Sequence, residues 1–232
     1  MSCRFHVLVA LVALLGAPLT SRAQNLVANG DFDNIGGVWT DNTGYGFDDF
    51  QSSGSTAIPD WTNVPGYTEE MWVTSPSSVG ISPSPGNGSM YWVDLTGYQN
   101  YKPYGGLEQV IATTPGEIYE CSFDVGSSTT YNSGAFDPAA LTASATGTSQ
   151  LASQLFTLSP TSTSTWATET FQFTADSSST TIEFLADSSY SSANVGLDNV
   201  RVSSVPEPSD FAPLIGALLA LAVFQQRRTR RA

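Results

Sequence analysis

The sequence predicts an all-β protein, an antiparallel β-sandwich flanked by two short terminal segments that are expected to be helical. Three observations predict this class. Between residues 24 and 204 no apolar stripe with a 3.6-residue period is sustained. Short segments of alternating polar and apolar residues recur instead, separated by clusters of Gly, Pro, Ser, Thr and Asn. About 180 residues are also enough for one domain of this kind.

Residues 1–23 are expected to be a secretory signal peptide. Arg4 stands before an unbroken apolar run at residues 7–15, and Ser21-Arg22-Ala23 is a small-x-small cleavage pattern. This run, at about 1.5 Å per residue in a helix, is too short to cross about 30 Å of hydrocarbon. A transmembrane anchor is therefore the weaker interpretation, and Gln24 is expected to begin the exported protein.

The clearest strand is predicted at residues 119–125, where apolar residues occupy every second position. Cys121 shares the apolar face of this strand and is therefore expected in the core. Two earlier strands are predicted at residues 90–95 and 107–112. The turn sequence at residues 113–116 then leads directly into the strand at 119–125.

Two later strands are predicted at residues 168–174 and 180–185. The turn residues 175–179 between them predict that the two strands form a hairpin. Residues 41–60 and 142–165 are interpreted as long loops, because Gly, Ser and Asp dominate the first and Ser, Thr and Ala the second. Apolar residues recur in the second loop, so it is expected to contain a strand.

The last strand changes the phase of its apolar residues. Val195 and Leu197 lie on one parity, whereas Val200 lies on the other. A β-bulge near Asp198-Asn199 would shift the parity by one residue, and it is predicted there.

The charge distribution excludes a nucleic-acid surface. Residues 24–204 contain only two basic residues, Lys102 and Arg201, against nineteen acidic ones, which gives a net charge of −17. Neutralising phosphates needs a row of Lys and Arg side chains. No nucleic-acid partner is therefore expected.

The exported part of the chain also lacks several kinds of catalytic chemistry. The only histidine, His6, and one of the two cysteines, Cys3, lie in the leader, which leaves Cys121 alone. A Ser-His-Asp triad, a Cys-His pair, a zinc site containing His and an internal disulfide are thus impossible. Carboxylates, hydroxyls and aromatic rings remain, and they suit a binding module better than most enzymes.

The C-terminal segment, residues 205–232, joins three features in order: a Pro-Glu-Pro motif, an apolar stretch at residues 211–224 and an arginine cluster. The motif and the cluster consist of Pro206, Glu207, Pro208, Arg227, Arg228, Arg230 and Arg231. The stretch would form a helix of only about 21 Å, with arginines on the cytoplasmic side. An ordinary C-terminal membrane tail is the simpler alternative.

This order resembles the PEP-CTERM sorting signal of Gram-negative, biofilm-forming bacteria. The resemblance implies that the tail is held transiently in the inner membrane and cut near the Pro-Glu-Pro motif by an exosortase-type enzyme. It also implies a destination at the cell surface or in the extracellular matrix. The match covers only the last 28 residues or so and concerns the destination of the protein.

Six motifs of the exported part, taken in order, resemble the choice-of-anchor C family of bacterial surface proteins. They are Asn25 to Asp33, Ile58 to Trp61, Val93 to Gly97, Gly105 to Gln109, Thr114 to Asp124 in part, and Leu197 to Val200. That family is similar to a plant cell-wall family of domains of unknown function. The resemblance implies a galactose-binding-like jelly roll at residues 24–204, a sandwich that many carbohydrate-binding modules use.

The resemblance also implies a structural calcium ion where the first motif meets the final strand. The residues at these positions are Asp33 and Asp198, with Asp31 as a third candidate, and oxygen ligands of this kind suit Ca²⁺. The family commonly has Glu where this chain has Asp33. The alternative is that Asp31 and Asp33 only turn the chain and that Asp198 or Asn199 caps a bulge.

Exposed aromatic rings are the side chains on which a sugar would stack, since a pyranose has an apolar face and polar edges. The candidates in or near loops are Tyr98, Tyr101, Tyr104, Trp72 and Trp39. The three tyrosines recur at every third residue around Lys102. Core packing is the better interpretation of Trp61, Trp92 and Trp166, which adjoin strand patterns.

These observations predict a non-catalytic carbohydrate-binding module, exported to the cell envelope or extracellular matrix, with extracellular polysaccharide as its partner. A passive matrix protein without a specific ligand is the alternative. A glycosidase needs only two carboxylates about 5 to 9.5 Å apart, and Glu69-Glu70, Asp48-Asp49 and Asp94 are available. Because such pairs occur by chance in an acidic chain, no catalytic residue is assigned.

Overall fold

The structure is a computed structural model of the chain. The residues that it describes are 24–36, 47–49, 58–64, 71–74, 81–85, 88, 90–96, 104–128, 138–162, 164–187, 194–206 and 226. The predicted signal peptide, residues 1–23, and the predicted apolar stretch, residues 211–224, lie outside these residues. Within the described residues, no helix has both the length and the apolar character needed to span a bilayer.

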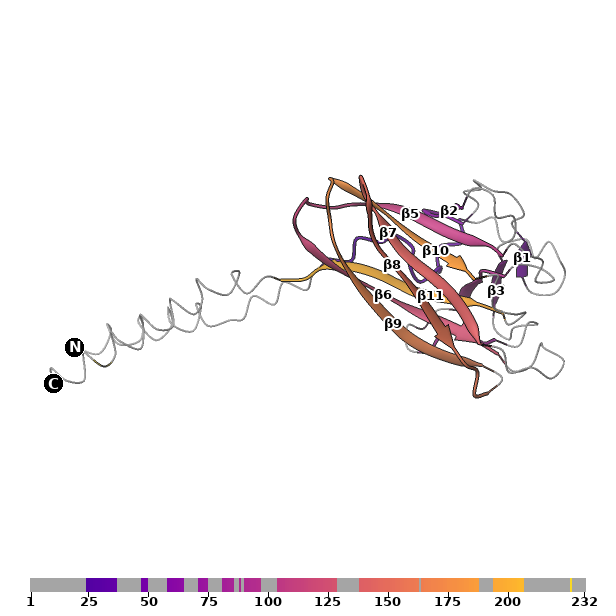
Figure 1. The fold of residues 1–232 in the computed structure, drawn as a ribbon. Coiled ribbons are helices and arrows are strands. Elements are labelled where there is room, and N and C mark those ends of the chain that lie inside the picture. Colours follow the sequence, from indigo (N-terminus) through magenta and orange to yellow (C-terminus); the bar gives the residue numbers. More distant parts are fainter. Residues whose placement is uncertain are drawn as a thin grey trace, which may run out of the picture.

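Two antiparallel sheets pack face to face, which confirms the predicted β-sandwich (Figure 1). In spatial order, sheet A contains β1 (Phe47–Asp49), β3 (Met71–Thr74), β4 (Tyr91–Asp94), β11 (Gly196–Ser204), β6 (Ile118–Ser127) and β9 (Thr165–Thr174). Sheet B contains β2 (Thr62–Asn63), β5 (Gly106–Ala112), β10 (Ser179–Ala186), β7 (Ala139–Thr146) and β8 (Gln150–Leu158).

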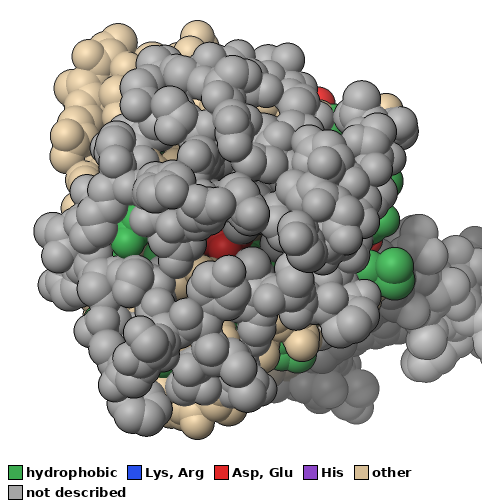
Figure 2. Space-filling view, turned by 90° about the vertical axis from the view of Figure 1, so that its right-hand side faces the viewer, with side chains coloured by type: hydrophobic (Ala, Val, Ile, Leu, Met, Phe, Trp, Pro, Cys, Tyr) green, Lys and Arg blue, Asp and Glu red, His purple; other side chains and the backbone are tan. Residues whose placement is uncertain are grey.

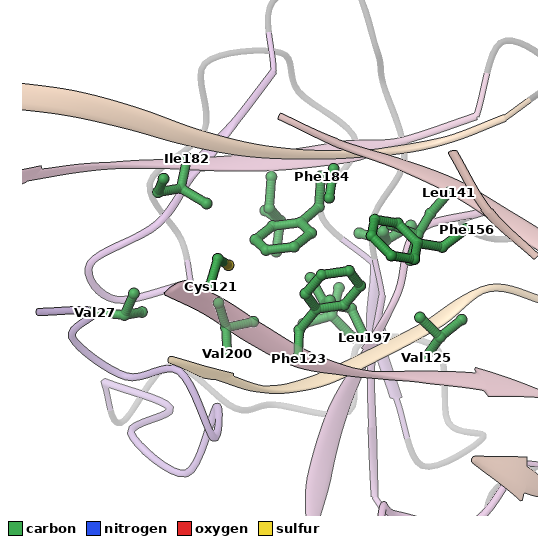
Figure 3. Packing of buried hydrophobic residues seen from close by; sticks show 14 of the residues in the cluster. Val27, Cys121, Phe123, Val125, Leu141, Phe156, Ile182, Phe184, Leu197 and Val200 are labelled. Atoms are coloured by element: carbon green, nitrogen blue, oxygen red, sulfur yellow. The ribbon is translucent and has the colours of Figure 1, made fainter. Parts of the chain in front are cut away.

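The core lies between the sheets and is apolar (Figure 3). The alternation predicted for residues 119–125 is confirmed, because Cys121, Phe123 and Val125 of β6 are at most 1% exposed. The Phe123 ring centroid lies 5.1 Å from that of Phe156 in β8 and 4.9 Å from that of Phe184 in β10. Phe123 therefore joins the two sheets. Burial raises the pKa of the Cys121 thiol, which is an inert core group.

The predicted hairpin of residues 168–174 and 180–185 is wrong. Both segments are strands, but β9 pairs with β6 in sheet A, whereas β10 pairs with β5 and β7 in sheet B. The turn between them crosses from one sheet to the other. A turn sequence shows that a chain reverses and does not show which strand becomes its neighbour, so the pattern could not distinguish the two arrangements.

The region that was interpreted as a loop at residues 142–165 contains the expected strand. It holds most of the β7–β8 hairpin, with Ala139 opposite Leu158 and a register shift at Ala145 and Thr146.

The predicted bulge in the last strand is also confirmed. The pairing of β11 with β6 shifts between Asp198 and Arg201, so that Val200 and Val202 return to the core.

Candidate functional site

The N-terminal segment, residues 25–30, lies beside β11 and extends sheet A past the end of β4. Leu26 N donates to Val202 O at 2.8 Å. Val200 N donates to Gly30 O, also at 2.8 Å. A side chain on Gly30 would place its Cβ 2.0 Å from Val200 O, so glycine is required for this close approach. The first sequence motif is therefore fixed directly to the last one.

Asn29 holds the turn that follows this segment. It adopts a φ of 48°, a left-handed conformation that Asn tolerates better than most residues. Its Nδ2 donates to Asn34 O at 3.0 Å and to Pro59 O at 2.9 Å. Its backbone oxygen accepts from Trp61 Nε1 at 3.0 Å.

Gln109 of β5 links the same turn to sheet B. Its Oε1 accepts from Ala28 N at 2.8 Å, and its Nε2 donates to Ala28 O and Asp60 O at 2.9 Å. Three of the motifs noted in the sequence thus meet in one hydrogen-bond network. These hydrogen bonds stabilise the fold at this point.

A polar pocket of about 240 Å³ opens where the N-terminal segment meets β11, and we call it the junction pocket. Its lining consists of Asn25, Val27, Asn29, Gly30, Asp31, Asn199, Val200 and Arg201. Asp31 and Arg201 are exposed. Arg201 is the only Lys or Arg among the residues that the structure describes. One pocket therefore presents a guanidinium, a carboxylate and several amides.

The β11 bulge places two successive polar side chains on the outer face of sheet A, the side turned away from sheet B. Asn199 has a φ of 54°, and its backbone N donates to Asp198 Oδ1 at 2.7 Å. Its Nδ2 donates to Asp124 Oδ2 of β6, also at 2.7 Å. Asn199 thus lines the junction pocket and is also bonded to Asp124 on the outer face.

Asp124 is a buried carboxylate, 6% exposed, at the centre of this outer face. Besides Asn199, its oxygens accept from Ser84 Oγ at 2.5 Å and from Thr168 Oγ1 of β9 at 2.7 Å. Three donors from three separate segments compensate the desolvation of this one charge. The sequence pattern could not identify this network, because the three donors are 40, 44 and 75 residues from Asp124 along the chain.

Two tryptophans lie farther along the outer face. Trp92 of β4 and Trp166 of β9 pack edge to face, with ring centroids 5.9 Å apart. Gly196 and Gly126 form the floor beneath them, since a Cβ on either glycine would lie within 2.8 Å of the Trp166 ring. Residues 81–85 cross the sheet here, and Trp166 Nε1 donates to Ser82 O at 2.8 Å. Trp92 is fully buried and Trp166 is half-buried, but neither belongs to the apolar core cluster in which both were expected to pack.

A second carboxylate, Asp94, is fully buried where β4 ends. Its Oδ1 accepts from Thr96 N at 2.9 Å and from Thr96 Oγ1 at 2.6 Å, while its Oδ2 has no hydrogen-bond partner. Burial raises the pKa of Asp94 to about 6 against the lowering effect of the Thr96 bonds and of the Val195 backbone amide. The carboxylate also contributes, after burial, to a raised pKa of Tyr104. Figure 2 views the molecule from the side on which β1 and β3 lie in Figure 1.

The predicted sugar-stacking residues are not brought together within the described residues. Tyr104 is 1% exposed and belongs to the core cluster, so the expectation of an exposed ring is wrong for this residue. It immediately precedes two residues, Gly105 and Gly106, whose backbones bond within the sandwich, which draws its ring inward. Trp72 lies in β3. Tyr98, Tyr101 and Trp39 lie outside the described residues.

The three predicted calcium ligands do not form a cluster. In the described ranges, no group of three or more His, Cys, Asp or Glu side chains is placed to hold a metal ion. Asp31 and Asp33 are exposed and share a turn, in which Asp33 N donates to Asp31 Oδ1 at 3.4 Å. Asp198 is fully buried. Asp31 accepts a hydrogen bond within its turn, and Asp198 accepts one from Asn199 N at the bulge. These are the contacts expected if the residues only turn the chain and cap the bulge.

From the sequence, Asn25, Ser84 and Arg201 received no functional role, and Asn199 only that of capping a bulge. The signal for Arg201 was present, because it is one of only two cations in a strongly acidic domain. Asn25 and Asn199 are separated by most of the chain, and only the pairing of the first segment with β11 shows that they are neighbours.

No family model matches this sequence, and no curated protein matches it. Among solved structures, the chain is similar to one described as "CBM4 structure and function", with 16% identity, a TM-score of 0.41, and coverage of 77% of this chain and 99% of that one. It is similar to TmCBM61 in complex with β-1,4-galactotriose, with 13% identity, a TM-score of 0.46, and coverage of 79% and 100%.

The chain is also similar to an arabinose-bound α-L-arabinofuranosidase, with 12% identity and a TM-score of 0.49. This match covers 78% of this chain but only 26% of the enzyme chain. The three likenesses are too distant to carry a ligand or an activity over to this chain.

Proposed function

We propose that this chain is a non-catalytic carbohydrate-binding protein whose open binding site is the junction pocket. The observation that carries this proposal is that Arg201 and Asp31 both line one polar pocket. A sugar hydroxyl both donates and accepts hydrogen bonds. Neighbouring hydroxyls are therefore matched by a guanidinium that only donates and a carboxylate that only accepts.

The size and charge of the site narrow the ligand. A volume of about 240 Å³ lies just below the range of about 300–1,000 Å³ found for drug-sized ligands, so the pocket suits one sugar unit. The central domain carries a net charge of −17, and this charge repels polyanions. A neutral extracellular polysaccharide with its terminal unit in the pocket is the ligand that fits both properties.

We also propose that the protein is exported and sorted as the resemblances imply. The last strand ends at Ser204, and Val205 N still donates to Ile118 O of β6. Pro206 is exposed directly after this contact, which would leave the Pro-Glu-Pro motif accessible to an exosortase-type enzyme. In a host that has such an enzyme, replacing Pro206, Glu207 and Pro208 with Ala should keep the unprocessed chain in the inner membrane, as measured by fractionation and mass spectrometry.

Structural calcium remains a proposal that rests on the family resemblance alone. If calcium binds, chelation should lower the melting temperature of the purified protein. An unchanged melt together with no calcium in elemental analysis would remove it. This measurement is independent of the sugar-binding proposal.

Binding of the purified full chain to neutral polysaccharides tests the proposed function. Arg201→Gln and Asp31→Asn should each weaken retention by about tenfold or more, because each removes charge-assisted hydrogen bonds of about 1.5–3 kcal/mol. Glu120→Gln, an exposed change on β6 of the same sheet, is the matched control and should leave retention unchanged.

The same assay separates the alternatives. Release of soluble sugar would indicate a carboxylate-based glycosidase. Absence of both binding and release across the polysaccharides would favour a passive surface protein. Binding that Arg201→Gln and Asp31→Asn leave intact would contradict the assignment of the pocket.

A further inference from the structure

A continuous row of polar groups connects the junction pocket to the tryptophan pair. From Arg201 the outer side of β11 presents Asn199 and Asp198, with Asp124 opposite Asp198 on β6. The row ends at Gly196, beneath the Trp92 and Trp166 rings. Five residues of strand span about 16 Å at roughly 3.3 Å per residue. A polymer with its end in the pocket would therefore extend over the tryptophans.

At the end of the row, the rings of Trp92 and Trp166 are packed together, but one buried hydrogen-bond donor has no acceptor. Trp92 is fully buried, and its indole N–H has no hydrogen-bond partner. In contrast, Trp61 Nε1 donates to Asn29 O and Trp166 Nε1 donates to Ser82 O. A buried donor without a partner destabilises the protein, so a group that accepts from it would stabilise this end of the face.

Residues 81–85, Ile-Ser-Pro-Ser-Pro, cross the outer face at this end, and we call them the strap. Ser84 Oγ donates to Asp124 Oδ2 at 2.5 Å, and Ser82 N donates to Ser164 Oγ at 3.1 Å. With the Trp166–Ser82 bond, these contacts attach the strap to β6, to β9 and to the residue before β9. Each of them uses a hydroxyl, amide or carbonyl group that a sugar hydroxyl can replace.

We infer that the strap is displaced by a neutral polysaccharide, which then stacks on Trp92 and Trp166 as a second subsite. The inference rests on the proposed function, because the polymer is first held in the junction pocket. A sugar hydroxyl would take the place of Ser84 on Asp124, so that exchange is close to neutral. Displacement also uncovers Ile81, which is fully buried in the strap, and ring stacking together with an acceptor for Trp92 N–H offsets this loss of burial.

A disulfide that locks the strap tests this inference. Ser82→Cys with Ser164→Cys joins two positions already in hydrogen-bond contact. The full chain is assayed with xylan, β-1,4-galactan and β-glucan, and with the disaccharide of each. The oxidised lock should retain the bound polymer at least tenfold less well than the reduced form, whereas disaccharide binding should not change.

The matched control lock is Thr113→Cys with Thr180→Cys in sheet B, where the two hydroxyls lie 3.0 Å apart. It should leave polymer and disaccharide binding unchanged. Equal polymer binding by the oxidised and reduced strap locks would contradict displacement of the strap. The proposed function would not be affected by that result. If the unmodified chain binds no polymer and no disaccharide, both the proposed function and the strap are wrong.

A second variant tests the strap without adding a crosslink. Ser84→Ala removes the bond to Asp124 and should raise polymer affinity by about fivefold, the effect of one hydrogen bond, without changing disaccharide affinity. Ser144→Ala, which removes a serine–carboxylate contact to Glu183 in sheet B, is its control. Polymer should also shift the tryptophan emission of the unlocked protein to longer wavelength. An emission that polymer leaves unchanged, with no gain in affinity for Ser84→Ala, would contradict the inference.

Discussion

The two faces of sheet A use the same strands for different purposes. Along β6, Phe123 and Val125 point into the core, whereas Asp124 and Gly126 belong to the outer face. The inner residues contact apolar neighbours in sheet B. The outer residues bond to hydroxyls and amides or lie beneath aromatic rings. Alternation within one strand thus separates the residues that fold the domain from those available for binding.

The two faces of sheet A also differ in the kinds of group that are buried there. The described inner face is closed by rings and aliphatic side chains, such as Phe123 between Phe156 and Phe184. Trp92 Nε1 at the outer face and Asp94 Oδ2 at the end of β4 are buried without hydrogen-bond partners, and so is Ser127 Oγ at the end of β6, which shares the parity of Phe123 and Val125. Native proteins leave few such groups, and those that remain often have a functional role. Stability should therefore depend mainly on the inner face, and ligand binding on the outer one.

The largest expected effect is on the inner face. Phe123→Ala removes a ring that joins the two sheets and should lower the free energy of unfolding by about 3–5 kcal/mol, through lost burial and the cavity left behind. Thr170→Ala, an exposed change on β9, should stay within about 0.5 kcal/mol. Urea denaturation measures both. Similar losses in the two variants would contradict the division between the faces.

The next effect is the pH dependence caused by Asp94. Its pKa is raised from 3.8 to about 6 in the folded protein, so the folded state binds the proton more tightly than the unfolded state. This favours folding below about pH 4, and the advantage is lost as the pH rises to 6. At pH 7 the ionised carboxylate costs about 3 kcal/mol.

Asp94→Asn should therefore be more stable than the unmodified chain at pH 7, by up to about 3 kcal/mol, and similar to it near pH 4. Urea denaturation across this pH range gives the comparison. Two stability curves that stay parallel from pH 4 to pH 7 would show that Asp94 does not titrate in this way.

A smaller effect is expected at the floor of the tryptophan pair. On Gly196 a Cβ would lie 2.8 Å from Trp166 Cη2 and 3.3 Å from Trp92 Cε3. Gly196→Ala should cost about 1–3 kcal/mol by overpacking and should change the tryptophan emission. Unchanged stability and emission would mean that the rings do not lie on this floor.

The sequence predicted strand positions better than strand partners. The alternation around Cys121 and the parity change around Asp198-Asn199 are local signals, and both features are found. The pairing of β9 with β6 depends on contacts some fifty residues apart, and no local pattern encodes it. β7 was missed as a separate strand, because its Ser, Thr and small Ala side chains carry a weak apolar signal.

The candidate site was less predictable than the fold. Loop position predicted an exposed ring for Tyr104, but burial depends on how the adjacent strand enters the sandwich. The junction pocket combines Asn25 and Arg201, which the pairing of the first segment with β11 brings together. The residues that line the pocket supply amides, one carboxylate and one guanidinium, whereas the composition had pointed to carboxylates, hydroxyls and aromatic rings.

The smallest expected effect concerns an exposed carboxylate that lies away from the outer face of sheet A. Asp176 accepts from Thr148 N and Oγ1 and from Ser149 N and Oγ, which joins the β9–β10 turn to the β7–β8 turn. These bonds lower its pKa to about 2. The carboxylate therefore stabilises the fold above its unfolded pKa near 4, and this contribution is lost as the pH falls toward 2. Asp176→Asn should lower the melting temperature slightly at pH 7 and not at all near pH 2. A difference that persists at pH 2 would mean that the effect comes from the shape of the turn and not from its charge.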